Sequence, residues 1–410
     1  MKAVRYLVLA VTITTAVAIL SSPSQAIPAF ARKYGFNCGM CHVAWPKLND
    51  FGQKFRMNAY QIPGQEDLEK PIREAYPPIA LRTMAGYTSD SFSPEGAESE
   101  VNQFQVNGLD MFAGGVLGFN KGFFLAYKPQ IEGGSGVEAQ TGEMEQASAM
   151  FSRLRSTWLN LRVGRFEAAY VPFSQLRSIS ISPYEVYGFN GSPELSAAGI
   201  RGSLNAFALA DTADGIEITG WGRGPLQYAF GVVDGSRNNK LDDGPADFYL
   251  RGAYVIGQGF GQTAGQRLGA TLYFGRARAL DVDTRHSFNR LGFDANMNRT
   301  PYQVMFQYIH GRDSSAFNVF RPDATYKFSG GFLQVNHFEH ESAKFLRYDW
   351  VNTPSEDDHD IGRITVGWRQ HLDHGLALQL EYSHRKVDNG AGPGSDLTEN
   401  FAAARLDWAF

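Results

Sequence analysis

The sequence predicts an all-β protein: a transmembrane outer-membrane β-barrel of about 16 antiparallel strands, preceded by a short α-helical or irregular segment. Three observations predict this fold class. The 410 residues include 30 Phe, 18 Tyr and 44 Gly, a mixture typical of closed sheets with aromatic girdles. From Ile79 onward, apolar and polar residues alternate in segments of about ten residues. The chain also begins with the pattern of an export signal.

Residues 1–26 are predicted to be a cleaved secretory signal peptide. Lys2 and Arg5 give a positive start, Leu7 to Leu20 form the apolar core, and Ser24-Gln25-Ala26 is a small-residue cleavage site. The alternative is a membrane anchor, but the apolar core is shorter than the roughly 20 residues that a spanning helix needs. Runs of basic residues are absent from the sequence, so no nucleic-acid partner is expected.

The chain contains two cysteines, and both lie in the sequence Cys38-Gly39-Met40-Cys41-His42. This is the C-x-x-C-H motif by which a c-type haem is attached covalently. Two thiols bond to the porphyrin edge, and the adjacent imidazole of His42 becomes the proximal iron ligand. A disulfide or a thioredoxin-like redox motif is the rival interpretation, but the surrounding residues have no βαβ pattern. The motif therefore predicts one haem c held by Cys38, Cys41 and His42.

The sixth iron position stays open at this stage. Met57 is a candidate thioether ligand, or equally a packing residue beside Phe51 and Phe55. A second imidazole would have to come from the C-terminal part of the chain, and an unliganded sixth position is also possible. The histidines considered there are His286, His310, His337 and His340.

The haem segment is predicted to span residues 27–78, ending at Tyr76-Pro77-Pro78, with the barrel at 79–410. A segment of this length is marginal for an independent core, so we expect it to lean on the barrel and plug its lumen. The alternative for the second part is a soluble β-sandwich or barrel with its apolar face inward.

Sixteen strands can be placed, with connections that alternate between longer polar loops and short turns, as in outer-membrane barrels. Thr88–Glu100 and Glu132–Gln146 are examples of the longer loops, and Asn120-Lys121 and Arg223-Gly224 of the short turns. The predicted strands begin near residues 79, 102, 122, 149, 161, 213, 225, 247, 266, 286, 301, 325, 343, 361, 375 and 400. An even number of strands places both ends of the barrel on the periplasmic side. The final strand ends at Phe410, a feature common in outer-membrane barrels.

One connection, Tyr170 to Asp214, is too long for a turn. We expect it either to fold into the lumen, narrowing the pore or packing on the haem, or to form an extracellular flap. A group of arginines near it marks an anion path or ordinary pore lining: Arg153, Arg155, Arg162, Arg165 and Arg177.

The stretch from Pro28-Ala29-Phe30-Ala31-Arg32 through the haem motif to Trp45-Pro46-Lys47-Leu48-Asn49-Asp50-Phe51-Gly52 resembles the fused monohaem cytochrome–porins of the outer membrane. These proteins share P-x-F-A-R before the motif and aromatic-Pro-x-Leu-x-x-Phe-Gly after it; here Trp45 stands where Phe usually precedes Pro. The close match covers about 40 residues, within which Pro28 to Gly52 contain the shared motifs.

The resemblance implies that Cys38 and Cys41 attach the haem and that His42 is its proximal ligand. It also implies a protein of the bacterial outer membrane, embedded in lipid, that accepts electrons from an extracellular donor, Fe(II) first among them. Its partner would be a periplasmic c-type cytochrome. Whether the chain is an enzyme, an Fe(II):cytochrome c oxidoreductase, is left open. The alternatives are electron export to an extracellular acceptor, and a solute porin with a haem-bearing plug.

Overall fold

The computed structural model describes thirteen stretches of the chain: 29–66, 78–94, 99–131, 139–189, 207–234, 247–257, 264–278, 285–314, 325–339, 341–354, 360–373, 375–388 and 396–409. The predicted signal peptide, His340 and the terminal Phe410 lie outside the described residues.

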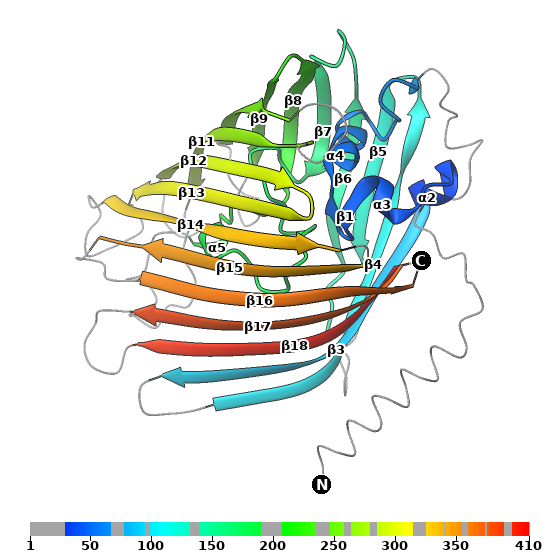
Figure 1. Cartoon of the computed structure of the whole chain (residues 1–410). Helices are drawn as coiled ribbons and strands as arrows, with labels where there is room; N and C mark the ends of the chain where they lie inside the picture. The colour runs from blue at the N-terminus through cyan, green and yellow to red at the C-terminus, as the bar shows by residue number, and fades with distance from the viewer. Residues whose placement is uncertain are drawn as a thin grey trace.

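Sixteen antiparallel strands form one closed barrel, as the sequence predicts (Figure 1). Each strand pairs with its neighbours along the chain, and β18 pairs with β3 to close the ring. The strands are β3 (Ile79–Pro94), β4 (Ser99–Gly118), β5 (Lys121–Lys128), β6 (Glu143–Phe151), β7 (Asn160–Phe166), β8 (Ala213–Arg223), β9 (Leu226–Asp234), β10 (Asp247–Val255), β11 (Arg267–Arg278), β12 (Arg285–Arg299), β13 (Tyr302–Ser314), β14 (Thr325–Phe338), β15 (Ser342–Asn352), β16 (Asp360–Asp373), β17 (Leu376–Asp388) and β18 (Leu397–Ala409).

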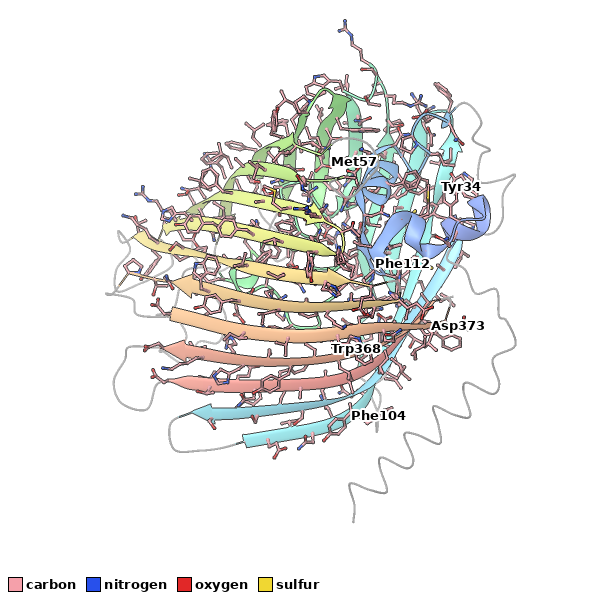
Figure 2. All side chains as sticks on the ribbon, in the orientation of Figure 1. Tyr34, Met57, Phe104, Phe112, Trp368 and Asp373 are labelled. Atoms are coloured by element: carbon pink, nitrogen blue, oxygen red, sulfur yellow. The ribbon has the colours of Figure 1, made fainter. Side chains whose placement is uncertain are left out.

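The strands turn apolar side chains outward, because successive residues of a strand face opposite sides of the sheet. In β10, the inward Tyr249 is 0% exposed and the outward Leu250 is 51% exposed. On β4, Phe104 is 62% exposed on the outer surface (Figure 2). An apolar outer band of this kind is typical of lipid-facing barrels. It contradicts the alternative of a soluble sandwich with its apolar face inward.

Several predicted strand ends are wrong. The strand expected at 149 begins at Glu143, β3 continues to Pro94, and β4 begins at Ser99. The polar residues of these extensions made them resemble loops in the sequence. Ladder hydrogen bonds join backbone groups, however, and need no apolar side chain.

The N-terminal segment contains the helices α2 (Ala29–Tyr34), α3 (Cys38–Cys41) and α4 (Asp50–Met57), and the short strands β1 (His42–Ala44) and β2 (Lys47–Leu48). Within the described ranges, no helix is long and apolar enough to cross a membrane. The segment lies at the barrel end where β18 finishes, beside β4 and β5 (Figure 1). There the ring of Phe30 meets Gly114, and the carbonyl of Ala59 meets Gly122 so closely that a Cβ would not fit.

The long connection between β7 and β8 enters the barrel. Its described part, 167–189 and 207–212, contains the short helix α5 (Glu185–Gly188). Tyr170 packs edge-on against Tyr249 and Tyr273 of the wall, with ring centroids 4.8 and 4.9 Å apart. Tyr184 stacks on Phe332 at 4.1 Å. The described part of this insert therefore fills the lumen, as one of the two sequence hypotheses expects, and does not form an extracellular flap.

Candidate functional site

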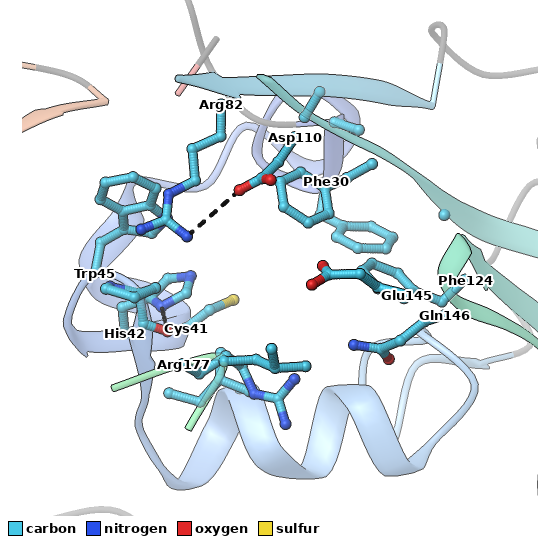
Figure 3. Close-up of a pocket in the computed structure, with 18 of the residues that line it drawn as sticks. Phe30, Cys41, His42, Trp45, Arg82, Asp110, Phe124, Glu145, Gln146 and Arg177 are labelled. Atoms are coloured by element: carbon cyan, nitrogen blue, oxygen red, sulfur yellow. Dashed lines mark hydrogen bonds and ion pairs between the residues drawn. The ribbon is translucent and has the colours of Figure 1, made fainter. Parts of the chain in front are cut away.

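Two cavities flank the segment Cys38-Gly39-Met40-Cys41-His42 inside the barrel. The first, of about 620 Å³, is lined by Cys38, Cys41 and His42 together with residues of β3 to β6, β18 and the insert (Figure 3). The second, of about 970 Å³, lies on another side of His42 and is lined by residues of α4 and the turns at the same barrel end. Both volumes are in the range of pockets that bind cofactors and small ligands.

The two cysteines sit at the ends of α3, on the wall of the first cavity. The side chain of Asn37 caps this helix by accepting a hydrogen bond from the Met40 amide at 3.1 Å. The cysteines are not joined by a disulfide. Burial and the neighbouring Cys38 raise the pKa of Cys41 to about 11, and burial also raises the pKa of Cys38. Thiols with raised pKa values are protonated at neutral pH, unlike the thiolate of a thioredoxin-type motif.

His42 is held in one orientation by the backbone. Its Nδ1 lies 3.1 Å from the Pro46 carbonyl, an acceptor, so Nδ1 carries the proton and donates it. Burial lowers the pKa of His42 to about 4, against a smaller opposing effect of this hydrogen bond, so the ring is neutral. Nε2 therefore keeps its lone pair. Metal-binding histidines use the same device, in which a backbone carbonyl fixes the tautomer and orientation of the ring.

Helix α4 and its N-cap residue pack against the backbone of the motif. Asn49 donates hydrogen bonds to the carbonyls of Met40 at 2.9 Å and Gly39 at 3.2 Å, and its side-chain oxygen caps α4 at Gly52. A Cβ at Gly52 would collide with the carbonyl of Cys41. The sequence Asn49-x-x-Gly52 thus allows α4 to pack directly against the end of α3.

The opposite wall of the first cavity combines aromatic rings with charges. In Figure 3, Glu145 and Gln146 face the Cys41 and His42 side across the cavity. Both side chains reach it because a β-bulge in β6 interrupts the register beside Ala126 and Tyr127. The cavity is lined by five cationic residues, Arg56, Arg82, Lys128, Arg177 and Arg405, against two acidic ones, Asp110 and Glu145.

Trp45 connects the motif to the seam of the barrel. The guanidinium groups of Arg82 and Arg369 lie over its ring, 5.2 and 4.9 Å from the centroid. Asp407 binds both arginines, at 2.8 Å from Arg82 Nη2 and 2.9 Å from Arg369 Nη2. The fused cytochrome–porins that this segment resembles usually have Phe at this position. The indole of Trp45 forms stronger cation–π interactions than a phenyl ring does.

The second cavity brings together cations from distant parts of the chain, of which only Arg177 was singled out in the sequence. It is lined by Lys47 of β2, Arg177 of the insert and Arg267 of β11. Burial, and to a smaller extent the charge of Arg267, lower the pKa of Lys47 to about 7. These residues are far apart in the sequence, so only the closed fold reveals the cluster.

The predicted site residues are divided between the two cavities. Cys38, Cys41 and His42 line the first cavity together, whereas Met57 lines the second. His310 and His337 alternate with lumen residues and so lie on the outer face of the barrel. The side chain of His286 is not described.

Of the five arginines singled out, Arg162 and Arg177 are in the lumen, each close to a glutamate. Arg165 is on the outer face with Asp214. Arg153 meets Glu66 of the N-terminal segment, and Arg155 is exposed. The thioether of Met84 also lines the first cavity and was not predicted from the sequence. Met84 is two residues from Arg82, so the alternation of a strand places both side chains on the same face, and this spacing could have indicated it.

No family model matches the chain, and no curated protein matches it. Among solved structures, the anion-selective porin from Comamonas acidovorans aligns with a TM-score of 0.59 at 14% identity, over 81% of this chain and 99% of the porin. The outer-membrane channel DcaP of Acinetobacter baumannii aligns with a TM-score of 0.56 at 8% identity, over 81% and 97%. Salmonella typhi OmpF, in a complex with daunomycin, gives 0.52 at 12%, again over 81% and 97%. The chain therefore has the sixteen-strand barrel fold of outer-membrane porins.

Proposed function

We propose that this chain is an outer-membrane electron-transfer protein that binds one haem c through Cys38, Cys41 and His42 in the first cavity. It would accept electrons from an extracellular donor, most favourably Fe(II), and pass them to a periplasmic c-type cytochrome. One observation carries the proposal: two free thiols and an imidazole whose Nδ1 is already engaged line the same cavity. The porin-like fold and the apolar outer band support a location in the outer membrane.

The residues present fit such a group. Cys38 and Cys41 would anchor it at its edge, and Nε2 of His42 would hold its iron. Phe30, Phe55, Phe112 and Phe124 give the cavity aromatic walls suited to contact with a planar macrocycle. The excess of cations along the cavity matches an anionic ligand, since a haem carries two carboxylates. When bound, a haem c supplies one-electron redox chemistry, whose potential depends on axial ligands, nearby charge and burial.

The first test is an expression of the chain together with c-type maturation, followed by haem staining of a denaturing gel. Covalent haem in the native chain, and none in Cys38→Ser/Cys41→Ser, is the expected result. If the native chain does not stain for haem, the proposal that it binds haem c is wrong. Anaerobic mixing of the oxidised protein with Fe(II) then tests the donor through the haem absorbance. Reduction by dithionite but not by Fe(II) would contradict the choice of donor.

Two variants refine the ligand assignment. His42→Ala should leave the barrel folded but abolish Fe(II)-driven reduction, because the proximal ligand is lost. Met57→Leu separates the two interpretations of Met57: a thioether ligand predicts a lower potential in the variant, and a packing role predicts no change.

A second candidate is a solute porin whose N-terminal segment is a plug, and the likeness to three solved channels favours it. Conductance in planar bilayers distinguishes the candidates. Large open-channel currents with no response to Fe(II) support the porin. The direction of electron flow is distinguished by the haem potential: a potential well above that of Fe(II) supports uptake, and a strongly negative one supports export.

A further inference from the structure

The second cavity contains positive charges that lack matching negative ones. Lys47 donates to a weak acceptor, the thioether of Met305, at 2.9 Å. Arg267 donates to the carbonyl of Pro172 at 2.7 Å, and its Nε is shielded from solvent without a partner. In the described part of the chain, neither side chain forms an ion pair with an aspartate or glutamate.

The nearby carboxylates are already neutralised by other cations. Asp50 lies 2.6 Å from Lys54, and Asp294 binds Arg251 through both carboxylate oxygens. Glu167 is shared between Arg177 and Arg56, so these two arginines have one carboxylate between them. The Nε of Arg177 is also without a partner. The lining of the cavity includes four cations, Lys47, Lys54, Arg177 and Arg267, and two carboxylates, Asp50 and Glu339. Glu339 is paired with Lys344, at 3.0 Å, so the excess of cations belongs to the cavity and not to one residue.

Uncompensated charges inside a protein are costly, because the low-dielectric surroundings disfavour an isolated ion. Water in the cavity can satisfy hydrogen-bond donors but cannot neutralise like charges that repel each other. A cavity lined by one sign of charge also concentrates the opposite ion. An anion in the cavity would therefore stabilise the state in which all of these cations keep their charge.

We propose that Lys47, Arg177 and Arg267 form an oxyanion-binding site in the second cavity. The three side chains come from three elements, the N-terminal segment, the insert and β11, and all line the same space. Guanidinium and ammonium groups are the side chains that proteins use for phosphate and carboxylate. At about 970 Å³, the cavity has room for a hydrated inorganic oxyanion. The carboxylates of a haem bound at His42, which borders both cavities, have the same chemistry.

The test is calorimetric titration of the full-length protein in detergent with inorganic phosphate at low ionic strength. The native protein should bind phosphate, and Lys47→Gln/Arg267→Gln should bind it at least about tenfold more weakly, because charge-assisted hydrogen bonds are lost. Arg267→Lys keeps the charge and should retain most of the affinity. Lys121→Gln removes an exposed cation outside both cavities and should bind as the native protein does. A heat-modifiable band on a denaturing gel confirms that each variant is a folded barrel.

A second arm identifies the source of the anion. Phosphate binding by both the haem-loaded protein and Cys38→Ser/Cys41→Ser assigns the site to a free oxyanion. If only the cysteine variant binds phosphate, the carboxylates of the bound haem occupy the site in the haem-loaded protein. This outcome rests on the proposed function. No binding by either protein overturns the site, as does an unchanged affinity in the folded double variant. If the native chain, expressed with c-type maturation, takes up no haem and still binds phosphate, the proposed function is refuted and the oxyanion site stands.

Discussion

At the scale of single residues, the geometry of the motif depends on close backbone contacts as much as on the cysteines and histidine. Asn49 holds the carbonyls of Gly39 and Met40, and Gly52 lets α4 approach the carbonyl of Cys41. These contacts fix where α3 ends and where β1 begins, and therefore where His42 points. The motif is readable in the sequence because its chemistry needs fixed spacing. The contacts of Asn49 and Gly52 that hold the motif cannot be predicted from the sequence, because they depend on which backbone atoms lie close together in the fold.

Replacing Gly52 by alanine should loosen this support. The added Cβ collides with the Cys41 carbonyl, which cannot rotate away, and lies 3.0 Å from Leu48 Cδ2. Overpacking of this kind costs about 1–3 kcal/mol. Hydrogen exchange over residues 38–57, measured by mass spectrometry, should become about 5- to 150-fold faster through local opening.

Gly39→Ala is the matched control for this substitution. Its Cβ would meet only the side chain of Asn37, at 3.5 Å, which is an ordinary contact. Exchange in the control should stay close to that of the native protein. Equal acceleration in both variants would mean that the close approach of α4 to α3 does not stabilise the motif.

The cationic lining of the second cavity marks the limit of sequence reasoning at this scale. Lys47 and Arg267 are 220 positions apart, and neither stands in a run of basic residues. Their proximity follows from barrel closure and from the seating of the N-terminal segment in the lumen. Arg177 was singled out as a possible anion contact from its arginine neighbours. Of those neighbours, Arg165 faces outward and Arg155 is exposed.

At the scale of elements, the strands could be predicted and the insert only in part. Period-two alternation gives strand identity, because one face of every strand contacts lipid. It fails at β6, where Glu145 and Gln146 line the first cavity and a bulge breaks the alternation. The length of the 170–214 connection indicated a functional loop, but its course depends on contacts with distant strands.

The insert is fixed to the wall through Glu381 of β17. This carboxylate accepts hydrogen bonds from the amides of Ile181 and Ser182, each at 2.7 Å, and from the hydroxyl of Ser180 at 3.3 Å. Arg347 adds bonds to the carbonyls of Ser182 and Pro183 at 3.0 and 2.9 Å. The segment 180–183 is therefore held by charge-assisted bonds, stronger than neutral ones.

Glu381→Leu should release the insert and raise the single-channel conductance measured in planar bilayers. The substitution leaves the part-buried amide of Ile181 and the buried amide of Ser182 without an acceptor. A buried donor without a partner costs about 1–3 kcal/mol, so conformations with the segment displaced become populated. Glu381→Gln keeps one acceptor oxygen and should give an intermediate conductance. Tyr382→Phe changes the next residue of β17, which faces outward, and should leave the currents unaltered. Native currents in Glu381→Leu would show that this contact does not narrow the pore.

At the scale of the whole molecule, closure of the barrel requires the last strand, β18, to pair with the first strand of the ring, β3. The seam between β18 and β3 runs from Leu397 opposite Pro94 to Ala409 opposite Arg82. Such long-range pairing lacks a local signal, so the sequence supports it only through the even number of strands and the final alternating segment. Near its end at Ala409, the seam contains a charged cluster in which the buried Asp407 contacts Arg82 and Arg369. The same two arginines cover Trp45, so closure of the ring and seating of the N-terminal segment share these side chains.

Asp407→Asn should therefore destabilise the whole barrel far more than an equivalent change at an exposed pair. The substitution preserves shape but removes the carboxylate that pairs with the buried Arg369, and it leaves Arg82 only its longer contact with Asp110, at 3.9 Å. Breaking a buried pair costs about 3–5 kcal/mol. Asp407 is 0% exposed, whereas Asp214, the partner of Arg165, is 53% exposed. Because solvent screens an exposed pair, Asp214→Asn should cost about 0–1 kcal/mol. Urea titration of the heat-modifiable, folded band measures both variants, and the midpoint should fall markedly for Asp407→Asn alone. Equal midpoints would mean that the backbone ladder between β18 and β3 closes the barrel without help from the buried cluster.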